Sequence, residues 1–178
     1  MKPQNVARRL AHVATSGATK RLGDGQRPIT IRKILVPTDF SPASKKSLSY
    51  ALRFAEGLNS EITLLHVLET GTPLTLAGRP AAAAFSEQEL SDAKQALHAL
   101  ANSAKTAGVA RTKSILRTGV ATHEIVEVAK ELDVDLIVIA THGFTGWRHF
   151  AIGSTAERVA RAAPCPVLVV REKEHDFI

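Results

Sequence analysis

The chain has 178 residues, of which 44% are hydrophobic and 4% aromatic, and its formal net charge is +6. This length suits one domain with a sizeable core and is short for two. The single cysteine, Cys165, excludes an internal disulfide, and no run approaches the roughly 18 apolar residues of a membrane-spanning helix. The first 30 residues also lack the apolar core of a secretory signal, so we expect a cytoplasmic protein with no membrane partner.

The positive charge is concentrated at the N-terminus. Residues 1–30 hold six basic side chains and one acidic one, whereas the remaining chain holds 17 basic and 16 acidic ones and is nearly neutral. We expect 1–30 to be a disordered, solvated extension; a transit peptide or an arm that touches polyanions are alternatives. The neutral remainder gives no reason to expect specific nucleic-acid binding. We expect one folded domain over 31–173 and a short C-terminal tail over 174–178.

Strand and helix patterns alternate along the chain. Runs rich in β-branched residues or leucine predict strands at 33–37, 62–68, 112–117, 135–140 and 166–170. The first helical stripe follows Ser41, an N-cap residue before a proline. Its apolar positions are Leu48, Ala51, Leu52, Ala55 and Leu58. Further stripes over 90–104 and 125–132 and a shorter pattern over 154–163 predict three more helices.

This alternation predicts an α/β fold, a doubly wound sandwich with a five-stranded parallel sheet. Several strands are apolar throughout, which is typical of strands covered on both faces. Such sheets bind ligands beyond the carboxyl ends of their strands, where the strand order reverses. The long connection over 70–85 has no repeating pattern, and it fits either a plain loop or part of a lid or subunit contact.

The first predicted strand ends in a carboxylate, Asp39, after Val36, Pro37 and Thr38. At the ligand-facing edge of a sheet, a carboxylate can accept hydrogen bonds from a ribose hydroxyl or an adenine amino group, or can lie near a metal. Asp is also common at helix starts, where it caps backbone N–H groups. Taken alone, the residue fits both roles equally well.

The loop after the fourth predicted strand carries the strongest signal. Gly143 and Gly153 leave room for a ligand beside the backbone, and a helix that begins at Ser154 offers N–H groups and a positive dipole end to an anion. The hydroxyls of Ser154 and Thr155 add donors. A turn that needs glycine and a serine N-cap would explain the same residues. Neither a P-loop nor a G-x-G-x-x-G after the first strand occurs.

Other polar residues have simpler interpretations. His66 lies in an apolar strand and is expected to be a hydrogen-bonded core residue. His123 and Glu127 are one helical turn apart, but no third ligand accompanies them, so no metal site is predicted. Cys165 lies between Pro164 and Pro166, where a structural role is expected.

Four segments together resemble the universal stress protein family: V-P-T-D, L-L-H-V, T-H-G separated by nine residues from G-S-T-A-E-R-V, and A-P-C-P-V-L-V-V. The resemblance covers 31–171 and implies strand order 3-2-1-4-5. It also implies a site for ATP, ADP or AMP, with Mg²⁺ as a candidate companion of the phosphates. The expected binding residues are Pro37, Thr38, Asp39, Val67, Ala140, Thr141, His142, Gly143, Gly153, Ser154 and Thr155.

Within that set, the resemblance implies that Asp39 and the backbone of Val67 hold the adenosine end. Family members that bind ATP carry a glycine where this chain has Ala140, and the extra methyl group could obstruct the triphosphate or strain a backbone that prefers positive φ. Two functions therefore stay open. One is a stress-response regulator that binds an adenine nucleotide, with at most slow hydrolysis, and the other is an interaction module with a vestigial pocket. The segment 166–170 is expected to pair with its copy in a homodimer.

Overall fold

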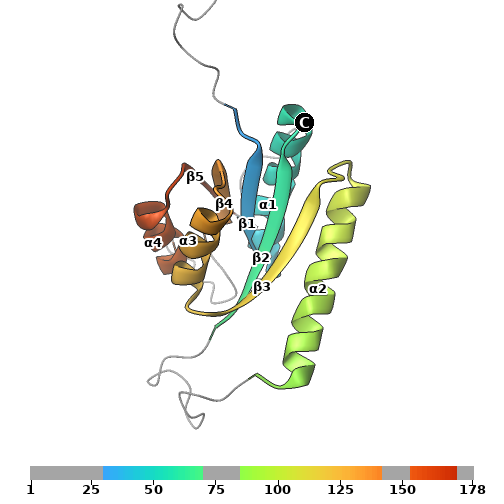
Figure 1. Cartoon of the computed structure of the whole chain (residues 1–178), viewed down its shortest axis with the longest axis vertical. Coiled ribbons are helices and arrows are strands. Elements are labelled where there is room, and N and C mark those ends of the chain that lie inside the picture. Colours follow the sequence, from blue (N-terminus) through green and yellow to red (C-terminus); the bar gives the residue numbers. More distant parts are fainter. Residues whose placement is uncertain (1–29, 70–84, 142–152, 172–178) are drawn as a thin grey trace, which may run out of the picture.

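The computed structural model describes residues 30–69, 85–141 and 153–171. Strands and helices alternate through these residues (Figure 1). The strands are β1 (Lys33–Pro37), β2 (Glu61–Glu69), β3 (Thr112–Gly119), β4 (Leu136–Ala140) and β5 (Val167–Val170). The helices are α1 (Pro42–Leu58), α2 (Glu87–Thr106), α3 (Ala121–Glu131) and α4 (Ser154–Ala162).

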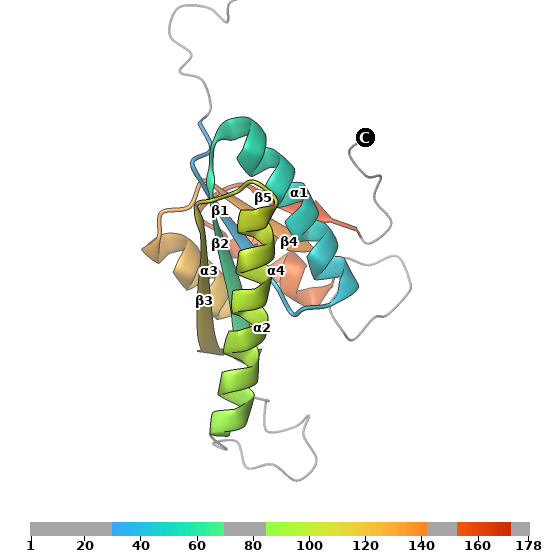
Figure 2. The same cartoon turned by 90° about the vertical axis from the view of Figure 1, so that its right-hand side faces the viewer.

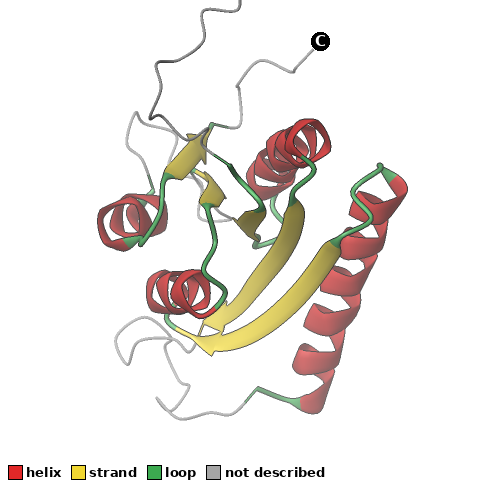
Figure 3. Cartoon of the chain, turned by 45° about the horizontal axis from the view of Figure 1, so that its top comes forward, coloured by secondary structure: helices red, strands yellow, loops and turns green. Residues whose placement is uncertain are grey.

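The strands form one parallel sheet of five strands in the order β3-β2-β1-β4-β5. This arrangement confirms both the predicted fold class and the strand order implied by the family resemblance. Helices α1 and α2 contact one face of the sheet, and α3 and α4 cover the other, as Figures 2 and 3 show from two directions. The protein is therefore a doubly wound α/β sandwich.

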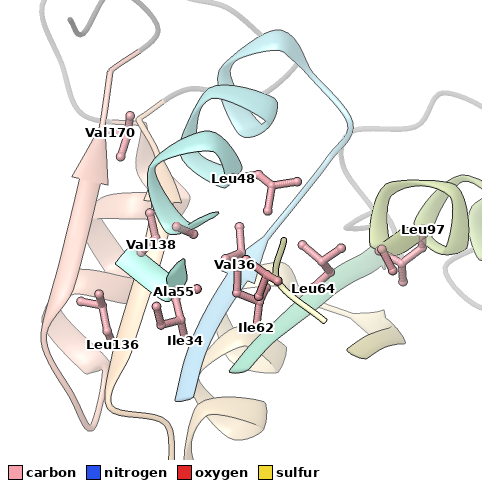
Figure 4. Packing of buried hydrophobic residues seen from close by; sticks show 13 residues of the cluster. Ile34, Val36, Leu48, Ala55, Ile62, Leu64, Leu97, Leu136, Val138 and Val170 are labelled. Carbon is pink, nitrogen blue, oxygen red and sulfur yellow. The ribbon is translucent and has the colours of Figure 1, made fainter. Parts of the chain in front are cut away.

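Side-chain alternation along the strands builds a separate core on each face of the sheet. In β1, Ile34 and Val36 lie in the cluster beneath α1 and α2, which Figure 4 shows, whereas Leu35 lies in the cluster beneath α3 and α4. All three side chains are fully buried. A buried side chain of this size contributes about 1.5–3 kcal/mol to folding, so the central strands hold the sheet edge in place.

The predicted element boundaries are close to those of the structure, with two informative differences. Strand β2 runs on to Glu69 because it pairs with β3 as far as Gly119. Leu58 was predicted to belong to the first apolar stripe, but its side chain is 47% exposed. Helix α1 ends at this residue, and Asn59, with φ 55°, turns the chain away in the left-handed conformation.

Candidate functional site

The site predicted from the sequence lies at the carboxyl ends of the two adjacent central strands, β1 and β4. From β1 the chain passes to α1 on one face of the sheet, and α4, the helix that follows β4, lies on the other face. This divergence is the switch point at which doubly wound sheets bind ligands. The predicted residues come from the turn after β1, the end of β2, the end of β4 and the start of α4.

The turn after β1 holds Asp39 within a network of short-range hydrogen bonds. Thr38, only 6% exposed, donates its backbone N–H to the carbonyl oxygen of Leu65 at 2.8 Å. Asp39 is half-buried, and its Oδ1 accepts the N–H of Ser41 at 3.1 Å. Ser41 is the N-cap of α1, with its hydroxyl accepting the N–H of Ser44 at 3.2 Å. Asp39 therefore supports the helix start, as one interpretation predicted, and a carboxylate can accept further hydrogen bonds in addition.

Phe40, next to Asp39, has a strained backbone. Its φ is +65°, a conformation that bulky residues rarely adopt and that costs about 1–3 kcal/mol. The N–H of Phe40 donates to the hydroxyl of Thr38 at 3.1 Å, which helps to hold this geometry. The sequence carries no signal for this strain, because nothing about a phenylalanine indicates a left-handed turn.

Val67 lies on β2, beyond the point where β1 leaves the sheet. The carbonyl oxygen of Leu65 faces β1, where it accepts the N–H of Thr38. Peptide groups alternate in direction along a strand, so the N–H and C=O of Val67, two residues later, face the same side. Since β1 ends at Pro37, opposite Leu65, the backbone of Val67 is directed toward the space beyond β1. This orientation is compatible with the role that the family resemblance implies for it.

The backbone of Ala140 resolves one of the two concerns raised by the missing glycine. Ala140 is the last residue of β4 and pairs with Val170 of β5. Among the described residues other than glycine, positive φ occurs only at Phe40, Asn59 and Asp133. Alanine is therefore accommodated without backbone strain at this position.

The two ends of the loop after β4 are tied together. Thr141 is 5% exposed and donates its N–H to Val170 at 2.9 Å, while its carbonyl oxygen accepts the N–H of Gly153 at 2.7 Å. The start of α4 is thereby fastened to the end of β4 and, through Thr141, to β5. His142 and Gly143, both predicted binding residues, lie outside the described residues.

No side chain in the described part of the chain caps the start of helix α4. Its N-cap residue is Gly153, so the interpretation of Ser154 as an N-cap serine is wrong; Ser154 is the first helical residue. The φ and ψ of Gly153 are −57° and 145°, which any residue can adopt. Ser154 is exposed and Thr155 half-buried. The first turn therefore presents N–H groups and the positive dipole end to the sheet edge, an arrangement suited to an anion.

The remaining polar residues show ordinary contacts. Glu127 accepts a hydrogen bond from the Lys130 ammonium at 2.9 Å, and this contact lowers the pKa of Glu127 below its usual value. Within 30–69, 85–141 and 153–171, no three His, Cys, Asp or Glu side chains are grouped as a metal site requires. Burial raises the pKa of the Cys165 thiol, and the nearby Asp135 adds to the effect. None of the described helices is both long and apolar enough to cross a membrane.

His66 makes more specific contacts than the sequence interpretation expected. It is half-buried rather than a full core residue, because it lies near the open end of β2. Its Nδ1 lies 2.7 Å from the carbonyl oxygen of Thr38, and its ring centroid is 4.4 Å from that of Phe40. The expectation of a hydrogen-bonded histidine is met, and the partner belongs to the candidate site itself.

Comparison with known proteins finds universal stress proteins that are similar to this chain over most of its length. A universal stress protein of Methanocaldococcus jannaschii is 33% identical over 145 residues, covering 82% of this chain and 85% of the relative. The universal stress protein YxiE of Bacillus subtilis is 33% identical over 146 residues, covering 78% of this chain and 98% of YxiE.

Solved structures share the fold. The universal stress protein UspA from Lactobacillus plantarum has a TM-score of 0.66 at 28% identity, covering 80% of this chain and 99% of UspA. A universal stress protein in complex with cAMP has a TM-score of 0.61 at 22% identity, covering 81% of this chain and 99% of that one. The universal stress protein from Archaeoglobus fulgidus in complex with dAMP has a TM-score of 0.59 at 21% identity, covering 80% of this chain and 98% of that one. The model of the universal stress protein family matches residues 30–171, and the chain belongs to this family.

Proposed function

We propose that the protein is a stress-response regulator that binds ATP or a related adenine nucleotide at the carboxyl edge between β1 and β4. The observation that carries the proposal is the start of α4, which no side chain of the described residues caps and which the bond from the Gly153 N–H to Thr141 holds at the end of β4. Uncapped N–H groups at the positive end of a helix dipole suit a phosphate. The carboxylate of Asp39 at the end of the adjacent strand suits the hydroxyl groups of a ribose.

The two ends of the nucleotide would meet different parts of the site. Asp39 and the backbone of Val67 would hold the adenosine end, supported by the turn residues Pro37 and Thr38. The phosphates would lie against Gly153, Ser154 and Thr155, with Ala140, Thr141, His142 and Gly143 completing the loop. Since the N–H of Gly153 donates to Thr141, the phosphate donors of α4 would be the next N–H groups. Mg²⁺ would accompany ATP through the phosphate oxygens, and we propose at most slow hydrolysis.

The first test is whether the purified protein carries or binds a nucleotide. Mass spectrometry of ligand released on denaturation would identify a resident nucleotide, and calorimetry with AMP, ATP, cAMP and dAMP would measure affinity. The last two probes are chosen because proteins that share the fold were solved with them. We expect saturable binding of at least one adenine nucleotide. No released nucleotide, together with no affinity for any of the four at millimolar concentration, would refute the proposal.

The second candidate function is a dimeric interaction module, which the open edge of β5 favours. β5 pairs only with β4 in the described sheet, and Val167, Leu168 and Val169 are only half-buried. An exposed strand edge rich in valine favours pairing with another strand, and a second copy across a two-fold axis would cover it. We propose such a homodimer for this protein, with or without a bound nucleotide.

The hydrogen-bond pattern of β5 selects the variant that tests the dimer. The carbonyl oxygens of Pro166 and Val170 face β4, where they accept the N–H groups of Ile137 and Thr141. By alternation, the N–H of Leu168 also faces β4 and that of Val169 faces the open edge. Val169→Pro should therefore weaken the dimer in analytical ultracentrifugation while leaving the β4–β5 ladder intact.

Leu168→Pro is the matched control, because it removes an N–H from within the sheet and should lower the melting temperature of the fold itself. A wild-type protein that sediments as a monomer at micromolar concentration would contradict the dimer.

We also propose a cytoplasmic location, in keeping with the single cysteine. For residues 1–30 we propose a role outside the folded domain.

A further inference from the structure

The turn that carries Asp39 is held in an unfavourable backbone conformation by contacts from another strand. Phe40 has φ +65°, and a phenylalanine in this region does not stay there without support. Part of the support is local. Thr38 accepts the N–H of Phe40 at 3.1 Å, and its hydroxyl also lies 3.1 Å from that of Ser44. Because the hydroxyl of Ser44 donates to the carbonyl oxygen of Ser41, Thr38 must be the donor to Ser44.

Further support comes from His66 on β2. A parallel ladder that continued past Pro37 would bring the N–H of Val67 to the carbonyl oxygen of Thr38. β1 has ended there, and the ring of His66 reaches this oxygen instead, with Nδ1 at 2.7 Å. The same ring lies against Phe40, with centroids 4.4 Å apart and the planes tilted by 42°. His66 thus contacts the residues on both sides of Asp39.

This contact determines which ring nitrogen carries a proton. A carbonyl oxygen only accepts hydrogen bonds, so Nδ1 must be the donor, and the neutral ring is the Nδ1–H tautomer. The opposite tautomer would set a lone pair against the oxygen of Thr38. His66 therefore acts on the turn through one particular N–H group.

We propose that His66 is a positioning residue for the adenosine end of the nucleotide site. Its Nδ1–H holds Thr38, and its ring holds Phe40 in the left-handed conformation, so that Asp39 between them stays at the sheet edge. The inference rests on the proposed nucleotide function, and it adds a residue that acts on the ligand only through this turn. Loss of the contact should weaken the binding of AMP and of ATP by the same factor, because both nucleotides share the adenosine end.

Substitutions that imitate one nitrogen at a time test the proposal. The side-chain amide nitrogen of asparagine occupies nearly the position of Nδ1, whereas that of glutamine lies nearer the position of Nε2. His66→Asn should bind AMP and ATP within about threefold of the wild type, whereas His66→Gln and His66→Phe should each lose about tenfold for both nucleotides. His98→Asn, at an exposed position of α2, is the matched control and should bind like the wild type.

Two further measurements separate positioning from general instability and from failure of the proposed function. Thermal melts identify any variant that is unfolded, and long-range ¹H–¹⁵N spectra of the wild type should show a protonated Nδ1 and an unprotonated Nε2 in the neutral ring. If His66→Gln and His66→Phe fold and bind like the wild type, or if the spectra show the other tautomer, positioning by His66 is refuted while nucleotide binding stands. A wild-type protein that binds no adenine nucleotide refutes both proposals.

Discussion

Replacing Gly153 with valine separates phosphate binding from folding, because the structure predicts different effects on the two. The residue has φ −57° and ψ 145°, which valine adopts readily. Valine is a poorer N-cap than glycine by up to about 1 kcal/mol, and the stiffer unfolded chain offsets about 0.4–1 kcal/mol of that loss. We therefore expect the free energy of unfolding to change by less than about 1 kcal/mol.

The effect on ATP should be larger. A β-branched side chain at the N-cap would stand over the N–H groups of Ser154 and Thr155, and losing one hydrogen bond to a charged oxygen costs about 1.5–3 kcal/mol. This cost corresponds to a loss of affinity of at least about tenfold. Calorimetry with ATP and AMP measures the effect, and Gly153→Ala, which adds a single methyl group, is the control. A folded valine variant that binds ATP as tightly as the wild type would show that no phosphate approaches this turn.

Three further predictions concern the ligand, the tail and the thiol. Ser154→Ala should weaken the binding of ATP more than that of AMP, whereas Asp39→Ala should weaken the binding of both alike. If calorimetry finds the reverse pattern, Asp39 would contact the phosphates and Ser154 the adenosine end, contrary to the proposal. Deleting 1–30 lowers the formal net charge from +6 to +1, since that segment carries six basic and one acidic side chains. The truncated protein should melt cooperatively, keep its nucleotide affinity and bind heparin less than the full chain, whose binding should fall with added salt. Burial raises the pKa of Cys165. Because the thiolate is the form that reacts, the rate of its reaction with iodoacetamide should rise at a higher pH than the rate for free cysteine. A pH–rate profile whose midpoint is equal to or below that of free cysteine would contradict this.

Local sequence signals were sufficient to predict the strands and helices of the fold. Apolar runs predicted all five strands, and Ser41 before Pro42 predicted the start of α1, because these features depend on neighbouring residues alone. The meeting of the β1 and β4 ends at one edge followed from the family resemblance, which supplied the strand order.

Conformation and contact between strands were decided only in the tertiary structure. The sequence raised the question of Ala140, and its answer required the backbone angles of the folded chain. From the sequence, His66 was expected to be an ordinary core residue, because its partner Thr38 is 28 positions away and the two meet only once β1 and β2 pair. The left-handed turn at Phe40 is invisible to local patterns for the same reason. Propensity and periodicity sum over neighbours, whereas a strained turn persists because distant residues hold it.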